Sequence, residues 1–176
     1  TKTAAFLRPV HGEEGVLEDN ALSRVKFQPM SIQALVADTQ WLKSLGIYQP
    51  IGAVGQDSYF FQQMLFHAHR IGLTSTPIHT YYAAVTNSTV NAIGPRFYEK
   101  YLPLEEDRSA WLREVGLLED YNAKRLEPFV KGWFVQKLAF AAEEDIDECK
   151  SLIRRLTRFY GKTSWKDAEL AELHAV

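Results

Sequence analysis

The residues best suited to chemistry lie in the stretch Gly52–Leu65, where a glycine-bearing turn delivers Asp57 to the start of a helix with an apolar face. A carboxylate in this position can accept hydrogen bonds from the free N–H groups of the first turn, and the helix dipole favours its negative charge. We therefore consider Asp57 a candidate catalytic base. Because Asp is also among the best N-cap residues, a purely capping role is the alternative.

Other ionisable residues are weaker candidates. His67 and His69 are two positions apart and point to different sides of a helix, which excludes a two-ligand metal clip on that helix. His79 follows the Asp57 helix in a predicted strand. It could reach the same cleft as a metal ligand or as a hydrogen-bond donor to phosphate, or it could be a hydrogen-bonded core histidine. The acidic triplet Asp145-Ile146-Asp147 lies in a helical run of acids, which favours a solvated turn over a metal site.

The elements that position Asp57 are predicted from pattern. Short apolar runs separated by Gly, Asn and Pro predict two or three strands or extended arms within residues 1–36, in the segments 4–7, 16–27 and 31–36. Asp38 or Thr39 can cap a short helix that Gly46 ends. The apolar spacing then predicts a helix over about 58–71 and a strand over 76–85.

The sequence after Gly94-Pro95 is rich in Leu, Glu, Lys and Arg at helical spacing, which predicts an almost wholly helical second half. We expect a helix over 104–115, stopped by Gly116, an aromatic face over 129–140, and two final helices over 145–160 and 165–174. Ser164 and Asp167 resemble a capping box for the last of these. The aromatic face is interpreted as core, or else as a groove for a partner or acceptor.

Composition limits the function further. The chain has 176 residues, a formal net charge of −2 and a sequence pI near 6.2, which argue against nucleic-acid binding. The single cysteine, Cys149, fits a reducing compartment. The sequence contains no apolar run of about 20 residues, no glycine-rich phosphate loop and no Gly-x-Ser-x-Gly motif. Because it starts without methionine in strand-like sequence, we expect a piece of something longer.

A basic cluster in the penultimate helix has two interpretations. Four cations, Arg154, Arg155, Arg158 and Lys162, flank apolar residues at helical spacing. The cluster could contact anionic lipid headgroups through an amphipathic helix, or it could be an ordinary solvated helix face.

Four segments together resemble the second half of a family 2 glycosyltransferase of the GT-A fold. They are Gly55-Gln-Asp-Ser-Tyr-Phe-Phe61, the helix to Arg70-Ile-Gly72, Pro77-Ile-His-Thr-Tyr-Tyr82 and Asn87-Ser-Thr-Val-Asn91. In that family a Glu-Asp pair opens a helix below the acceptor site, and its Asp is the general base. The resemblance covers roughly residues 1–100, and the remaining residues are similar to the helical tail of enzymes that build bacterial surface polysaccharide.

The resemblance implies roles for particular residues. Asp57 would be the base of an inverting transfer from a nucleotide-sugar to a hydroxyl of a saccharide or lipid-linked acceptor. Gln56, where the family has Glu, would help to position the acceptor, and Trp41 would offer a stacking face to a sugar. His79 and Ser88 would lie near the diphosphate or the metal. The parent enzyme would use Mn²⁺ or Mg²⁺, whereas this piece would lack the donor-binding half, bind no metal and be inactive alone.

Taken together, the sequence predicts a mostly helical α+β fold. It would have short strands in a partial GT-A-like acceptor-binding region over 1–94, followed by a helical subdomain over 95–176. We expect the protein in the cytoplasm, or at the inner face of the membrane. A homo-oligomer could form through the helical tail or an open strand edge. The alternative function is a non-catalytic helical module for protein interaction or assembly at a membrane surface.

Overall fold

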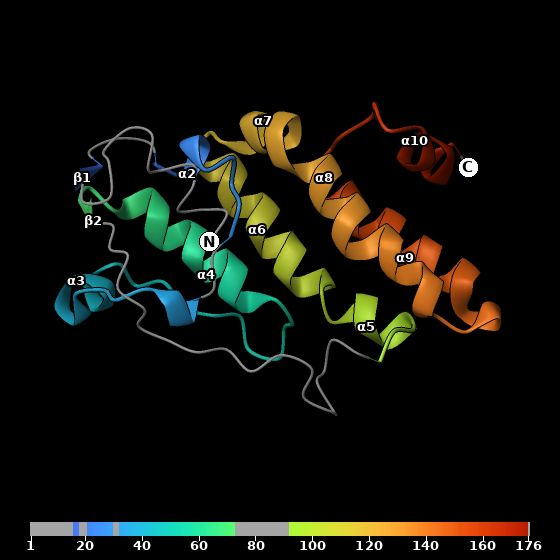
Figure 1. The fold of residues 1–176 in the computed structure, drawn as a ribbon, viewed down its shortest axis with the longest axis horizontal. Coiled ribbons are helices and arrows are strands. Elements are labelled where there is room, and N and C mark those ends of the chain that lie inside the picture. The colour runs from blue at the N-terminus through green and yellow to red at the C-terminus, as the bar shows by residue number, and fades with distance from the viewer. Residues whose placement is uncertain (1–15, 18–20, 30–31, 73–91, 176) are drawn as a thin grey trace. The chain divides into compact units, whose positions relative to one another are not determined.

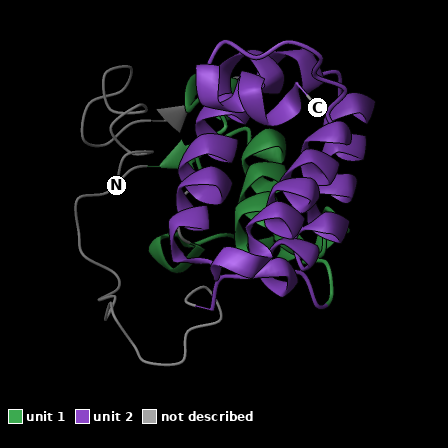
Figure 2. Ribbon diagram, turned by 90° about the vertical axis from the view of Figure 1, so that its right-hand side faces the viewer, with its two compact units in different colours: residues 1–51, 55–83 green, residues 52–54, 84–176 purple. Residues whose placement is uncertain are grey.

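The structure is a computed structural model of the 176-residue chain, and it describes residues 16–17, 21–29, 32–72 and 92–175. The chain divides into two compact units, which Figure 2 colours separately. Unit 1 comprises residues 1–51 and 55–83, and unit 2 comprises residues 52–54 and 84–176. The described part is mostly helical with two very short strands, which confirms the α+β class predicted from the sequence.

Helix α4 (Gln56–His67) is the longest helix in the described part of unit 1 (Figure 1). Its five consecutive side chains from Phe61 to Leu65 are all buried, so the middle of the helix is enclosed on nearly every side. The helix was predicted to reach residue 71, and this was wrong. Ala68 adopts an extended backbone with ψ 117°, and the chain enters strand β2 (Ile71–Gly72), which pairs antiparallel with β1 (Val16–Leu17).

A second correction concerns the segment before α4. The strand predicted over 16–27 is wrong over its second half, because Ala21–Arg24 forms the short helix α2. Ala21, Leu22 and Val25 are buried, at a spacing that fits one helical face against α4 rather than the alternation of a strand. The strand predicted over 31–36 is also wrong, because a 3-10 turn, η1 (Ile32–Ala34), replaces it.

The turn after α2 is held by a hydrogen bond from a side chain of α4. Lys26 and Phe27 have φ angles of 52° and 55°, a left-handed conformation that is uncommon outside glycine. The Phe27 N–H donates to the Leu22 carbonyl at 3.0 Å, and the Phe27 carbonyl accepts the buried Gln62 amide at 2.9 Å. A buried polar side chain on α4 thereby satisfies a backbone group that the turn leaves open.

Helix α3 (Thr39–Ser44) forms where capping chemistry predicts it. The Asp38 carboxylate accepts the Trp41 N–H at 2.7 Å. Leu45 is the C-cap, and Gly46 follows with φ 63°, a conformation that glycine adopts without strain.

Unit 2 is built around helix α9 (Ile146–Arg158), which contacts α5 (Pro95–Glu99), α6 (Leu102–Glu114) and α10 (Ala168–His174) (Figure 1). Pro95 opens α5 at the first helical position, as predicted. Gly116, with φ 73°, follows the end of α6, also as predicted. The last helix begins three residues later than predicted, because Asp167 is its N-cap and accepts the N–H groups of Glu169 and Leu170.

Between α6 and α9 runs a helical segment of mixed geometry. It contains α7 (Leu118–Tyr121), the π-helix η2 (Asn122–Leu126), α8 (Glu127–Phe129), the π-helix η3 (Val130–Phe134) and the 3-10 helices η4 (Val135–Phe140) and η5 (Glu143–Asp145). Pro128 lies between the two π segments and has no N–H to donate, so it interrupts the ordinary i→i−4 pattern. The predicted aromatic core face is confirmed for buried Phe134 and wrong for Phe140, which is 76% exposed.

None of the helices within the described ranges combines the length and the apolar character that a bilayer crossing requires.

Candidate functional site

Asp57 is the second residue of α4, in its first turn, and its side chain is exposed. The N-cap is Gly55, in the left-handed conformation with φ 77°, and no side chain caps the helix. The capping role considered for Asp57 is therefore wrong. The turn is held instead by Ser58, whose hydroxyl donates to the Gly55 carbonyl at 2.7 Å. The first-turn carboxylate lies near the positive end of the helix dipole and is accessible to a bound molecule.

A pocket of about 420 Å³ lies next to α3 within unit 1. This volume falls in the range of small-molecule sites, roughly 300–1,000 Å³. Helix α3, the loop after it and one α4 residue line the pocket: Leu42, Lys43, Gly46, Ile47, Tyr48, Gln49 and Phe60.

The α4 residue Phe60 links the pocket to the candidate base. Asp57 precedes Phe60 by three positions and Gln56 precedes it by four, so all three side chains leave the same side of the helix. Gln56 is half-buried and Asp57 is exposed, and neither of them lines the pocket itself. The helix that carries the candidate base therefore also provides a wall of the pocket.

Trp41 contributes indirectly. It is half-buried on α3 and does not line the pocket, whereas its neighbours Leu42 and Lys43 do. The Asp38 carboxylate accepts its N–H, and its carbonyl accepts the Ser44 hydroxyl at 2.7 Å, so its backbone helps to fix the short helix. Tyr48 is the aromatic wall residue that sequence reasoning missed. It is 80% exposed in a loop with no periodic pattern to reveal it.

The two remaining predicted site residues, His79 and Ser88, lie outside the described residues. No three His, Cys, Asp or Glu side chains come together as a metal site in the described ranges. The divalent cation that the resemblance implies for the parent enzyme stays a prediction, as does the role of His79 near it.

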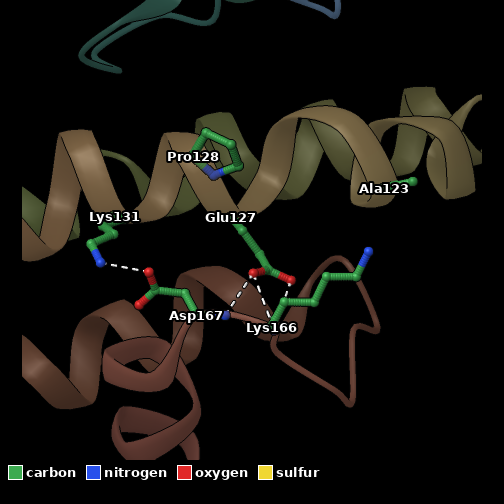
Figure 3. A pocket seen from close by; sticks show the side chains of 6 residues that line it. All are labelled: Ala123, Glu127, Pro128, Lys131, Lys166 and Asp167. Atoms are coloured by element: carbon green, nitrogen blue, oxygen red, sulfur yellow. Dashed lines mark hydrogen bonds and ion pairs between the residues drawn. The ribbon is translucent and has the colours of Figure 1, made fainter.

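A second pocket, of about 350 Å³, belongs to unit 2 and is shown in Figure 3. Its centre is Glu127, which accepts the backbone N–H groups of Lys166 and Asp167 and pairs with Lys162. Partial burial opposes ionisation of Glu127, but these N–H donors and Lys162 outweigh burial and lower its pKa. Lys131 pairs with Asp167. These ion pairs and hydrogen bonds join α8 to the start of α10. Of the charged side chains that line the pocket, only the Lys166 ammonium is in no ion pair within the described residues.

The most unusual electrostatic feature is a buried ion pair in unit 2. Glu105 and Arg108 on α6 have side chains 1% and 2% exposed, with Arg108 Nη1 at 3.0 Å from Oε1 of the carboxylate. The Tyr160 hydroxyl donates to Glu105 Oε2. Burial raises the pKa of Glu105 although Arg108 and Tyr160 oppose that shift. Because no solvent reaches the pair, we interpret it as structural rather than catalytic.

The basic cluster on α9 does not present a free amphipathic face. Leu152, Ile153 and Leu156 are buried in unit 2. Arg154 donates to the Leu173 carbonyl at 3.2 Å and thereby ties α9 to α10. Peripheral membrane contact stays a prediction that concerns the exposed Arg155 and Arg158 alone.

Comparison of the chain with models of known protein families, with curated proteins and with solved structures found no match.

Proposed function

We propose that this chain is the acceptor-binding part of an inverting glycosyltransferase, which moves a sugar from a nucleotide-sugar donor to a hydroxyl acceptor. One observation carries the proposal: Asp57 lies on the same side of helix α4 as Phe60, which lines the pocket. Asp57 does not itself line the pocket, but it is an exposed carboxylate one helical turn before Phe60, and a carboxylate within reach of an acceptor hydroxyl can act as a general base. The sequence resemblance in the same stretch supports the same assignment.

The proposed chemistry uses one residue of this chain. As the acceptor hydroxyl oxygen attacks the anomeric carbon, its proton passes to an Asp57 carboxylate oxygen. The new oxygen–carbon bond forms on the face opposite the departing nucleoside diphosphate, which takes the electron pair of the broken bond. The anomeric configuration is inverted. Because Asp57 is exposed, it can return the proton to water after the product leaves.

Gln56 has a supporting role in this proposal. Its side-chain amide can both donate and accept hydrogen bonds, so it can orient the acceptor without adding a second negative charge beside the base. We place the parent enzyme in the cytoplasm or at the inner face of the membrane, in the synthesis of bacterial cell-surface polysaccharide. A divalent cation, when bound to the donor half, would supply charge neutralisation at the diphosphate.

The test uses a longer protein that includes the donor-binding half. Asp57→Asn keeps the shape of the side chain and removes the base, so transfer should fall by a factor of about 10² to 10⁴. Glu119→Gln is the matched control, because Glu119 is an exposed carboxylate at the second position of α7, the position that Asp57 occupies in α4. The control should transfer sugar at the wild-type rate. Wild-type activity of Asp57→Asn would refute the assignment.

A further inference from the structure

The unit 1 pocket combines aromatic surface with a single charge. Tyr48 and Phe60 supply two aromatic rings, and Leu42 and Ile47 supply aliphatic walls. Lys43 is the one formally charged residue among those that line it, and it is exposed. Within the described ranges no ion pair joins Lys43 to an acidic side chain. The ammonium group is thus available to a ligand at the pocket.

Each of these groups matches a part of a sugar ring. Aromatic rings offer flat apolar surfaces at low entropic cost, and the C–H face of a pyranose can pack against them. The Gln49 amide both donates and accepts hydrogen bonds, as sugar hydroxyls require. A lysine ammonium is a compact donor suited to a carboxylate or a phosphate. With a neutral sugar the exposed ammonium would stay solvated by water, whereas an acidic group on the sugar would pair with it.

We propose that the pocket binds an acceptor sugar that carries a carboxylate or phosphate group, with Tyr48 packing on the ring and Lys43 contacting the anion. This inference rests on the proposed function, because it makes the pocket the acceptor site. It goes further than the proposed function because it names the chemical class of the acceptor. The acceptor is an anionic saccharide, and the acidic group is recognised apart from the hydroxyl whose proton Asp57 takes.

Lys43 also lies in the last turn of α3, where a cation interacts favourably with the helix dipole. A role limited to stabilising α3 would not affect ligand preference. Arg24 provides a matched control, since it is another exposed cation in the last turn of a short unit 1 helix and does not line the pocket.

The experiment is a binding titration of the 176-residue chain, followed by NMR chemical shifts, with three probes. They are methyl glucuronide, glucose 6-phosphate and the neutral methyl glucoside. Exposed charge contacts of this kind are worth up to about fivefold in affinity, so at least one anionic probe should bind about fivefold tighter than the neutral one at low salt. That preference should shrink at high salt because ions screen exposed charges.

Variants assign the effect to particular side chains. Lys43→Gln should abolish the preference for the anionic probe, whereas Arg24→Gln should keep it. Tyr48→Ala should weaken all three probes about tenfold, and Tyr48→Phe should retain binding because the ring remains. Lys43 and Tyr48 are exposed, so these changes should leave the circular dichroism spectrum unchanged.

The outcomes separate this inference from the proposed function. Tighter binding of the glucuronide or of the sugar phosphate supports the inference and identifies the acidic group. Equal binding of all three probes, or an unchanged preference in Lys43→Gln, would overturn it. Two results taken together would contradict only the acceptor class. They are equal binding of the charged and neutral probes, and a loss of sugar transfer in the Asp57→Asn form of the longer protein.

Discussion

Replacement of Arg108 by Met should destabilise unit 2 severely. The substitution keeps an apolar side chain of similar length but removes the guanidinium that pairs with Glu105, itself only 1% exposed. Tyr160 would remain as a hydrogen-bond donor to the carboxylate, and Arg125 would still act on it electrostatically, but the directly paired guanidinium would be lost. Breaking a buried pair in this way costs about 3–5 kcal/mol. Because domains of ordinary size have net stabilities of about 5–15 kcal/mol, this loss is a large part of the total.

The double variant Glu105→Leu/Arg108→Met tests the reasoning more closely. It removes both charges and leaves the Tyr160 hydroxyl without its acceptor, which costs about 1–3 kcal/mol. Replacement of a buried pair by apolar residues is often neutral or stabilising. The double variant should therefore be more stable than Arg108→Met alone, although it carries one more substitution.

The assay is urea unfolding followed by circular dichroism, with comparison of midpoints and slopes. Lys124→Met is the control, because the Lys124–Asp120 pair on the surface is 41% and 30% exposed and should contribute only about 0.3–0.5 kcal/mol. An Arg108→Met protein within about 1 kcal/mol of wild type would refute the argument that burial makes this ion pair critical. A double variant no more stable than Arg108→Met would refute it as well.

Four further predictions concern unit 2. Gly132→Ala should stabilise the protein by roughly 0.5–1 kcal/mol in urea unfolding, because Gly132 is helical and an added Cβ meets nothing within 4 Å. Gly116→Ala should destabilise it by about 1 kcal/mol in the same assay, since the space is equally open but φ is 73°; equal effects of the two substitutions would contradict this. Tyr160→Phe should cost about 1–3 kcal/mol, because the buried Glu105 carboxylate loses a donor; an unchanged urea midpoint would exclude that bond. Burial lowers the pKa of His174, which therefore favours its neutral form in the fold, and stability should fall as pH drops below about 6.5; the same decline in His174→Gln would assign it to other groups.

Helix-capping and helix-ending residues predicted the ends of some helices correctly. The Asp38 carboxylate and Gly46 mark the two ends of α3, and Pro95 and Gly116 mark ends of unit 2 helices, because these signals depend only on backbone groups nearby in the chain. The segment that forms α2 was interpreted as a strand because a four-residue helix is too short to display a period. Its stability depends on packing against α4, which the local sequence does not show.

The buried ion pair was missed because Glu105 and Arg108, three positions apart, look like an ordinary surface pair of a charged helix. The sequence did contain one signal of this buried pair. Arg108 lies midway between the buried Leu104 and Leu112, four positions from each, and so on the apolar side of α6. A cation on that side has to find a counter-charge, which identifies the adjacent acid as its buried partner.

The candidate site was predicted in part. Asp57 was singled out by its place at the start of a helix and Gln56 by the resemblance, and the roles of both stay predictions. The pocket was not, because it depends on how the loop after α3 lies against Phe60 of α4. Lys43 comes from the short helix α3 and Tyr48 from the irregular loop after it, and neither segment is long enough to show by periodicity which side chains face a ligand. His79 and Ser88 lie outside the described residues, so their roles stay predictions.

The most direct test of the central claim is the rate of sugar transfer by the longer protein with Asp57→Asn. We predict a fall of about 10² to 10⁴ in that rate, because the variant lacks the base but keeps the shape of the side chain. A wild-type rate in Asp57→Asn would contradict the assignment of Asp57 as the catalytic base.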